Sequence, residues 1–84
     1  MFKLVFLGKL GDVAPARLAD IERPQGVRTV SDLIQWLSVD QPLLARAMAA
    51  TTTRLIVNQS VTHDHSLELA NGDEIAFLPP MSGG

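Results

Sequence analysis

The sequence contains no cysteine. The chain can therefore form no disulfide and no thiolate zinc site, and it has no cysteine nucleophile. This absence excludes several kinds of chemistry and is compatible with a reducing compartment.

Basic charge is scarce and scattered. The chain carries seven Lys and Arg residues against nine Asp and Glu residues, a formal net charge of −2. A protein that follows a phosphate backbone needs a basic patch or stripe. The basic residues are instead spread along the chain, at Lys3, Lys9, Arg17, Arg23, Arg28, Arg46 and Arg54. We therefore expect no nucleic-acid partner.

Long hydrophobic runs are lacking as well. The opening MFKLVFLGKLGD is interrupted by Lys3 and Lys9, and is too short and broken for a signal peptide or a membrane span. We expect a cytoplasmic protein that does not enter a membrane. With 84 residues, 46% of them hydrophobic, the chain suits one small globular domain. We place that domain at residues 1–78 and a C-terminal tail at 79–84.

Five segments have the composition and alternation of β-strands. They are Phe2–Leu7, Arg17–Glu22, Leu55–Val57, Ser60–Thr62 and Glu74–Leu78. In the last segment, Ile75 and Phe77 share one side, while Ala76 and Leu78 share the other. Either both sides are covered, or one apolar side faces outward. Two tight turns are expected, at Asn58-Gln59 and at Asn71-Gly72.

The stretch TVSDLIQWL predicts an amphipathic helix. Thr29 and Asp32 stand three residues apart, the spacing of a capping box. The apolar residues that follow have helical spacing: Val30, Leu33, Ile34 and Leu37. Asp40 before Pro42 predicts the start of a second, shorter helix. A strand hairpin, a helix and a return strand beside the first strand indicate an α+β domain, with a sheet packed on one main helix.

The end of the chain, NGDEIAFLPPMSGG, is the most specific feature of the sequence. Pro79 and Pro80 have no N–H group and a fixed φ, so the sheet must stop and the chain should leave extended. The six residues 79–84 can reach roughly 20 Å. Residues 75–84 have no charged side chain, which leaves the carboxylate of Gly84 as the only ionised group. Gly83 and Gly84 fit a slot too narrow for other residues.

A terminal carboxylate is a weak nucleophile and a poor electrophile. It becomes reactive when a nucleotide-using partner converts it to an acyl-phosphate or acyl-adenylate. The serines have no companion base in a recognisable arrangement, and no glycine-rich phosphate loop precedes a helix. We therefore expect a chain without catalytic groups of its own, whose reactive atom lies on Gly84.

The Asn-Gly-Asp-Glu turn, the strand EIAFLPP and the terminal SGG resemble the ubiquitin-like sulfur-carrier family. The likeness is greatest to MoaD, the small subunit of molybdopterin synthase, and LVFLGKLGD and IVNQ support it. The tail departs modestly from the family pattern, with Leu78 at a position where an aromatic is common and Met81-Ser82 where a β-branched pair often stands. These departures bear on partner preference more than on chemistry.

The resemblance implies a β-grasp fold with an extended Gly-Gly tail. It also implies that a MoeB-like enzyme uses ATP to adenylate Gly84, that the carboxylate becomes a thiocarboxylate, and that the tail enters a MoaE-like large subunit within a heterotetramer. There the sulfur would pass to precursor Z (cyclic pyranopterin monophosphate) during molybdenum cofactor synthesis. The chain would be the non-catalytic subunit of a sulfurtransferase and would bind no cofactor. Without cysteine it could not hold sulfur as a persulfide. Pro79, Pro80, Met81, Ser82 and Gly83 would form the tail, and Leu78 is our candidate for partner docking.

Three alternatives remain open at this stage. A thiamine-pathway sulfur carrier would use the same tail but is typically smaller, and the helical stretch Asp40–Ala50 argues against it. A ubiquitin-like modifier would form an isopeptide bond with lysines. A passive β-grasp binding module would not need its tail. The pair His63 and His65 is interpreted as part of a polar turn, because two histidines do not make a metal site.

Overall fold

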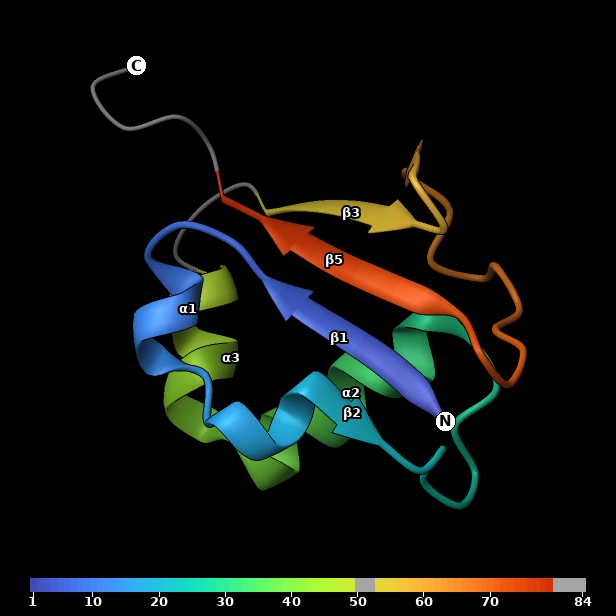
Figure 1. Ribbon diagram of the computed structural model, residues 1–84, viewed down its shortest axis with the longest axis horizontal. Coiled ribbons are helices and arrows are strands. Elements are labelled where there is room, and N and C mark those ends of the chain that lie inside the picture. Colours follow the sequence, from blue (N-terminus) through green and yellow to red (C-terminus); the bar gives the residue numbers. More distant parts are fainter. Residues whose placement is uncertain (50–52, 80–84) are drawn as a thin grey trace.

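The computed structural model describes residues 1–49 and 53–79, which form a mixed sheet with helices packed against it (Figure 1). The elements follow in the order β1 (Phe2–Phe6), α1 (Leu10–Val13), the 3₁₀ helix η1 (Ala16–Ala19), β2 (Asp20–Ile21), α2 (Val30–Asp40), α3 (Pro42–Ala49), β3 (Arg54–Val57), β4 (Ser60–Thr62) and β5 (Glu74–Leu78). The strand order in the sheet is β2-β1-β5-β3-β4. The described residues thus form the α+β arrangement expected from the sequence.

The last strand of the chain lies in the middle of the sheet. β5 runs parallel to β1, with Leu4 opposite Ile75 and Phe6 opposite Phe77. On its other side β5 runs antiparallel to β3, with Leu55 opposite Phe77. The predicted return strand beside the first strand is therefore confirmed, and both central strands point toward the same end of the domain.

Helix α2 begins where the sequence predicts. The Thr29 side chain accepts a hydrogen bond from the Asp32 N–H at 3.2 Å, and Oδ2 of Asp32 accepts the Thr29 N–H at 3.1 Å. Oδ2 of Asp32 also accepts the backbone N–H of Arg28 at 2.9 Å. The Arg28 and Thr29 N–H groups stabilise the carboxylate and lower the pKa of Asp32. The capping box is confirmed.

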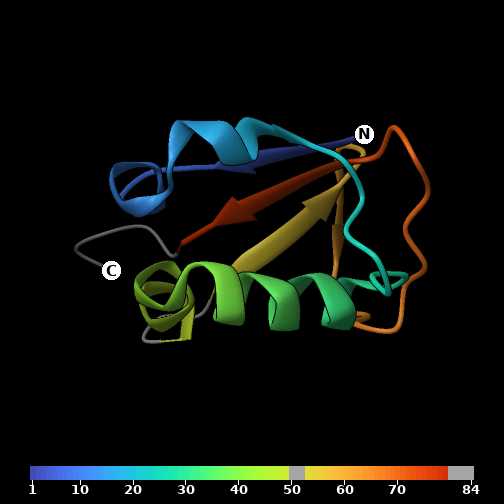
Figure 2. The same cartoon turned by 90° about the horizontal axis from the view of Figure 1, so that it is seen from below.

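The core lies between the sheet and the two longer helices. Figure 2 shows α2 and α3 along one side of the sheet. The helices contribute Val30, Leu33, Leu37, Leu44 and Met48 to the core. The inner side of the sheet contributes Phe2, Leu4, Leu55, Val57, Ile75 and Phe77, all of them buried. Burial of these side chains is the main favourable contribution to folding.

The predicted strand Arg17–Glu22 is wrong for most of its length. η1 occupies its first part, and only Asp20 and Ile21 pair with β1. Pro15 precedes η1, its carbonyl accepts the Leu18 N–H at 3.1 Å, and Leu18 is fully buried. Two apolar residues three positions apart, Leu18 and Ile21, fit a 3₁₀ turn as well as an irregular strand.

Two other details also differ from the sequence prediction. The short helix α1 was not expected, because glycines on both sides of Leu10 suggested a loop. Asp40 was expected to start the second helix, but it is the last residue of α2, and the Gln41 N–H donates to the Leu37 carbonyl at 2.7 Å. The Asp40 carboxylate instead accepts a hydrogen bond from Arg17 at 2.7 Å. None of the described helices is long and apolar enough to cross a membrane.

Candidate functional site

The candidate site is the end of β5, where the predicted tail begins. β5 ends at Leu78, and Pro79 follows it as the first tail residue, half-buried. The other predicted tail residues lie outside the described residues: Pro80, Met81, Ser82, Gly83 and Gly84. The acyl-carrying role of Gly84 therefore stays a prediction, and the structure describes the base from which the tail starts.

That base is held on both sides by hydrogen-bonded neighbours. Phe77 pairs with Phe6 of β1 and Leu55 of β3, and Leu78 lies opposite Arg54. One residue beyond β1, the Leu7 N–H donates to the Phe77 carbonyl at 3.0 Å. The tail therefore starts from the most firmly paired strand of the sheet rather than from an edge.

The inner side of this end is closed by two aromatic rings. Phe77 is fully buried, and its ring stacks on that of Phe6 with 4.9 Å between centroids and an interplanar angle of 6°. Aromatic pairs in such contact contribute packing energy beyond the area that they bury. The stacked pair joins β5 to β1 at the end of the two strands, directly before the tail.

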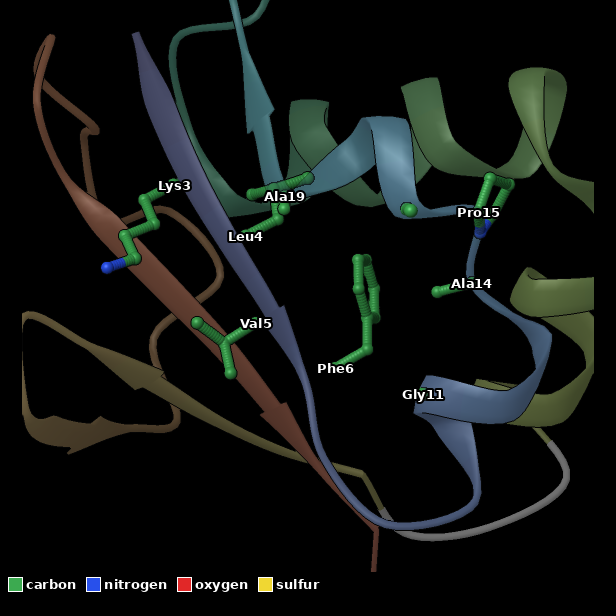
Figure 3. A pocket seen from close by; sticks show the side chains of 9 residues that line it. Lys3, Leu4, Val5, Phe6, Gly11, Ala14, Pro15 and Ala19 are labelled. Carbon is green, nitrogen blue, oxygen red and sulfur yellow. The ribbon is translucent and has the colours of Figure 1, made fainter.

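The outer side of the same strands is apolar and is not covered by the described helices. The strand register places Val5 and Ile56 on either side of Ala76. In Figure 3, Lys3 and Val5 point away from the side on which Phe6 lies. Val61 of β4 lies opposite Ile56 and is 56% exposed. We call Val5, Ile56, Val61, Ala76 and Leu78 the open face.

Leu78 lies on the open face, as the sequence predicts. It is on the side opposite Ile75 and Phe77, and it is half-buried rather than part of the core. The helices therefore cover only one side of β5, and on the other side Leu78 is partly exposed, while Ala76 between its neighbours is 7% exposed. The sequence also places Ala76 on this side, but Val5, Ile56 and Val61 were missed. The signal for Ile56 was the uninterrupted apolar run Leu55–Val57, in which Ile56 must face away from its neighbours.

The groove beside β1 has a mostly apolar lining. This groove of about 310 Å³ runs along β1 and is lined mostly by small and apolar residues such as Gly11, Ala14 and Ala19, with Lys3 as the one ionisable side chain. Figure 3 shows this groove between β1 and the segment Gly11–Ala19. The lining offers no nucleophile paired with a base.

The two histidines lie in a polar turn. His63 and His65 are exposed. Between them, Asp64 accepts hydrogen bonds from the hydroxyl and the N–H of Ser66, and these bonds lower the pKa of Asp64. Among residues 1–49 and 53–79, no group of three or more His, Cys, Asp or Glu side chains is placed to hold a metal ion.

Known proteins resemble this chain over almost its whole length. The model of the ThiS family matches residues 5–84. A molybdopterin synthase sulfur carrier subunit from Dictyostelium discoideum is 30% identical over 84 residues, which is 99% of this chain and 95% of that protein.

Two solved structures share the fold. SAMP1 from Haloferax volcanii superposes with a TM-score of 0.72 at 23% identity, over 99% of this chain and 98% of its own. A putative molybdopterin converting factor, subunit 1, from Pyrococcus furiosus has a TM-score of 0.68 at 21% identity, over 95% of this chain and 97% of its own. These likenesses confirm the ubiquitin-like β-grasp fold. The family match over residues 5–84 shows that the chain belongs to the ThiS family of ubiquitin-like sulfur carriers.

Proposed function

We propose that this chain is the sulfur-carrier subunit of a molybdopterin synthase and that it works in the cytoplasm. The observation that carries the proposal is the identity of 30%, across 99% of the chain, to a relative named as such a subunit. The terminal pair Gly83-Gly84 supports it, because that pair offers an unhindered acyl group.

The proposed loading of sulfur has two steps. In a MoeB-like enzyme, a carboxylate oxygen of Gly84 attacks the α-phosphorus of ATP, and pyrophosphate leaves. A sulfur nucleophile equivalent to sulfide then attacks the carbonyl carbon, and AMP leaves with the electrons of the broken carbon–oxygen bond. The product is a thiocarboxylate on Gly84. This chain contributes the acyl end, and its partners contribute the catalytic groups.

The proposed delivery takes place in a MoaE-like large subunit, within a heterotetramer. The tail places the thiocarboxylate beside cyclic pyranopterin monophosphate. The sulfur attacks a carbon of the pterin side chain and an oxygen substituent leaves, which gives a thioester between the two molecules. Water then attacks the acyl carbon, the carbon–sulfur bond to Gly84 breaks, and the carboxylate is restored. Each loaded chain delivers one sulfur atom, so two are needed for the dithiolene. A narrow tail suits this step, because glycine residues can pass where a Cβ would collide.

The open face is the proposed docking surface for the large subunit. Its centre is apolar, formed by Val5, Ile56, Ala76 and Leu78, and its rim is charged, with Arg54 opposite Leu78 and Lys3 4.0 Å from Glu74. An apolar centre with a polar rim is typical of protein interfaces. Leu78 comes directly before the tail, so docking there would fix the start of the tail at the entrance of the partner.

A reconstituted reaction tests this function. The chain is incubated with a MoeB-like enzyme, ATP, a sulfide donor, a MoaE-like subunit and cyclic pyranopterin monophosphate, and the dithiolene product is measured. We expect product only when ATP and the activating enzyme are both present. Loading of the chain without any dithiolene product would contradict the molybdopterin assignment.

Leu78→Arg should weaken binding to the large subunit. We expect the dissociation constant to rise about tenfold or more, because a charge would replace an apolar side chain at the centre of the interface. Val39→Arg is the matched control, since Val39 is 85% exposed on α2, away from the open face. Calorimetric titration measures both. Equal dissociation constants for the two variants would contradict the docking surface.

A thiamine-pathway sulfur carrier is the second candidate. Membership of the ThiS family fits it, and it would load sulfur on the same residue. The reconstituted reaction separates the two, because such a carrier would be loaded but would deliver nothing to the pterin. A ubiquitin-like modifier would instead give an isopeptide product with lysines, visible as a higher-mass conjugate.

A further inference from the structure

The turn after β1 lies against the base of the tail. Gly8 follows β1, Pro79 follows β5, and the two strands are parallel neighbours. Figure 1 shows this turn at the same end of the sheet as the end of β5. Gly8 has φ +57°, in the left-handed region. A Cβ built on Gly8 would lie 3.2 Å from Cγ and 3.8 Å from Cδ of Pro79.

Both segments are fixed by hydrogen bonds. The Leu7 N–H donates to the Phe77 carbonyl at 3.0 Å, which holds the turn to β5. On the other side, the Gly11 N–H donates to the Gly8 carbonyl at 3.1 Å, and the Leu10 N–H donates to the Leu7 carbonyl at 3.2 Å. The Leu7 hydrogen bond therefore holds the turn to β5, and the other two fix the conformation of the turn itself.

A side chain at position 8 must consequently displace Pro79. Carbon atoms pack best at about 3.5–4.0 Å, so a Cβ 3.2 Å from Cγ is too close. The ring fixes the φ of Pro79, although Cγ can still move as the ring changes its pucker. Leu78, the preceding residue, is held opposite Arg54. The Pro79 ring must then give by a few tenths of an ångström, through a change of pucker and a shift of the chain at Pro79.

We propose that Gly8 is a positioning residue of the sulfur carrier, and this rests on the function proposed above. Because Gly8 has no Cβ, the Pro79 ring can occupy the space beside it. Gly8 thereby sets the direction of the chain at Pro79. Gly8 touches neither the acyl group nor a nucleotide, and it acts through Pro79. Misplacing a reacting group lowers the rate of its reaction even when its chemistry is intact.

Gly26 provides a matched control. Its φ is +86°, so alanine there is strained in the same way as at Gly8, but a Cβ on Gly26 would meet no atom within 4 Å. Gly8→Ala and Gly26→Ala should therefore both lower the melting temperature. Only Gly8→Ala should change the direction of the chain at Pro79.

The first arm of the experiment measures loading kinetics. The MoeB-like enzyme, ATP and a sulfide donor are used at a temperature at which every variant is folded. We expect Gly8→Ala to lower kcat/KM for the carrier about threefold to tenfold, while Gly26→Ala stays near the wild type. In a Pro79→Ala background, which lacks Cγ and Cδ at that position, Gly8→Ala should have a much smaller effect. Equal kinetics for Gly8→Ala and Gly26→Ala, or an undiminished effect without the proline ring, would overturn the proposal.

The second arm does not depend on sulfur chemistry. In NMR spectra of the wild type, we expect contacts between the Hα protons of Gly8 and the ring protons of Pro79. In Gly8→Ala, the amide signals of residues 81–84 should shift, and in Gly26→Ala they should not. Absence of the contact, or unchanged signals in Gly8→Ala, would overturn the positioning role. If no activating enzyme loads the wild type while these NMR results hold, the proposed function fails and the effect of Gly8 on the tail stands.

Discussion

Replacement of Gly84 by alanine is expected to abolish sulfur loading while leaving the fold intact. The last strand ends at Leu78, and the stacked rings of Phe6 and Phe77 close the core before the tail begins. A methyl group on the terminal residue would crowd the acyl carbon. It would also hinder entry into the narrow slot that the proposed activating enzyme offers to glycine. We expect the loading rate to fall by about a hundredfold or more. Intact-mass measurement of the loaded fraction over time gives the rate.

A residue added after Gly84 should have the same effect, because it moves the carboxylate away from the activating centre. Ser82→Ala is the matched control: it alters the same tail without adding atoms near the acyl group, and it should be loaded within a few-fold of the wild-type rate. Thermal unfolding should be unchanged in all three variants, because the buried core residues of the described chain all precede residue 79. If Gly84→Ala were loaded as fast as the wild type, the role of the terminal glycine would be contradicted.

Phe77→Ala is expected to destabilise the domain severely. The Phe77 side chain is fully buried, and it contacts Phe6 in the stacked pair. Truncation of a buried phenylalanine to alanine typically costs about 3–5 kcal/mol. Small domains have unfolding free energies near the lower end of about 5–15 kcal/mol. A large share of the stability should therefore be lost, as measured by denaturant unfolding.

Phe77→Leu serves as the comparison for this prediction. It keeps most of the apolar volume and leaves a smaller cavity, so it should cost clearly less than Phe77→Ala. A larger loss of unfolding free energy in Phe77→Ala than in Phe77→Leu would show that the cavity left by the missing ring causes the loss. A change in unfolding free energy below about 1 kcal/mol for Phe77→Ala would contradict the packing described for the end of β5.

The features that could be predicted from sequence are those fixed by local patterns. Helix α2 follows from the capping box of Thr29 and Asp32 and from the spacing of Leu33 and Leu37. The position of Leu78 on the side opposite Ile75 and Phe77 follows from the alternation of β5. In each case one short segment contains all the information, because the pattern and its structural consequence lie within a few residues.

The features that could not be predicted depend on contacts between distant segments. Leu18 and Ile21 fit either a strand or a 3₁₀ turn, and the choice depends on burial of Leu18 against the rest of the core. Gly8 shows the same limit, because its partner Pro79 lies near the other end of the chain. A glycine directly after a strand indicates a turn, but it does not indicate what lies against that turn.

The position of β5 connects the fold with the proposed function. A strand in the middle of the sheet is held from both sides, by β1 and by β3, up to the last residues before the tail. The described residues that precede the predicted tail are therefore firmly anchored. In the proposed function, this anchoring would let partners act on the end of the chain while the domain remains folded.

The central claim is that the C-terminal carboxyl group carries the sulfur. Intact-mass spectrometry after incubation with a MoeB-like enzyme, ATP and a sulfide donor tests it most directly, with fragmentation to locate the change. The account predicts a mass increase equal to the exchange of one oxygen for one sulfur, localised to Gly84. An unchanged mass with every activating enzyme tried, or sulfur located on any other residue, would contradict it.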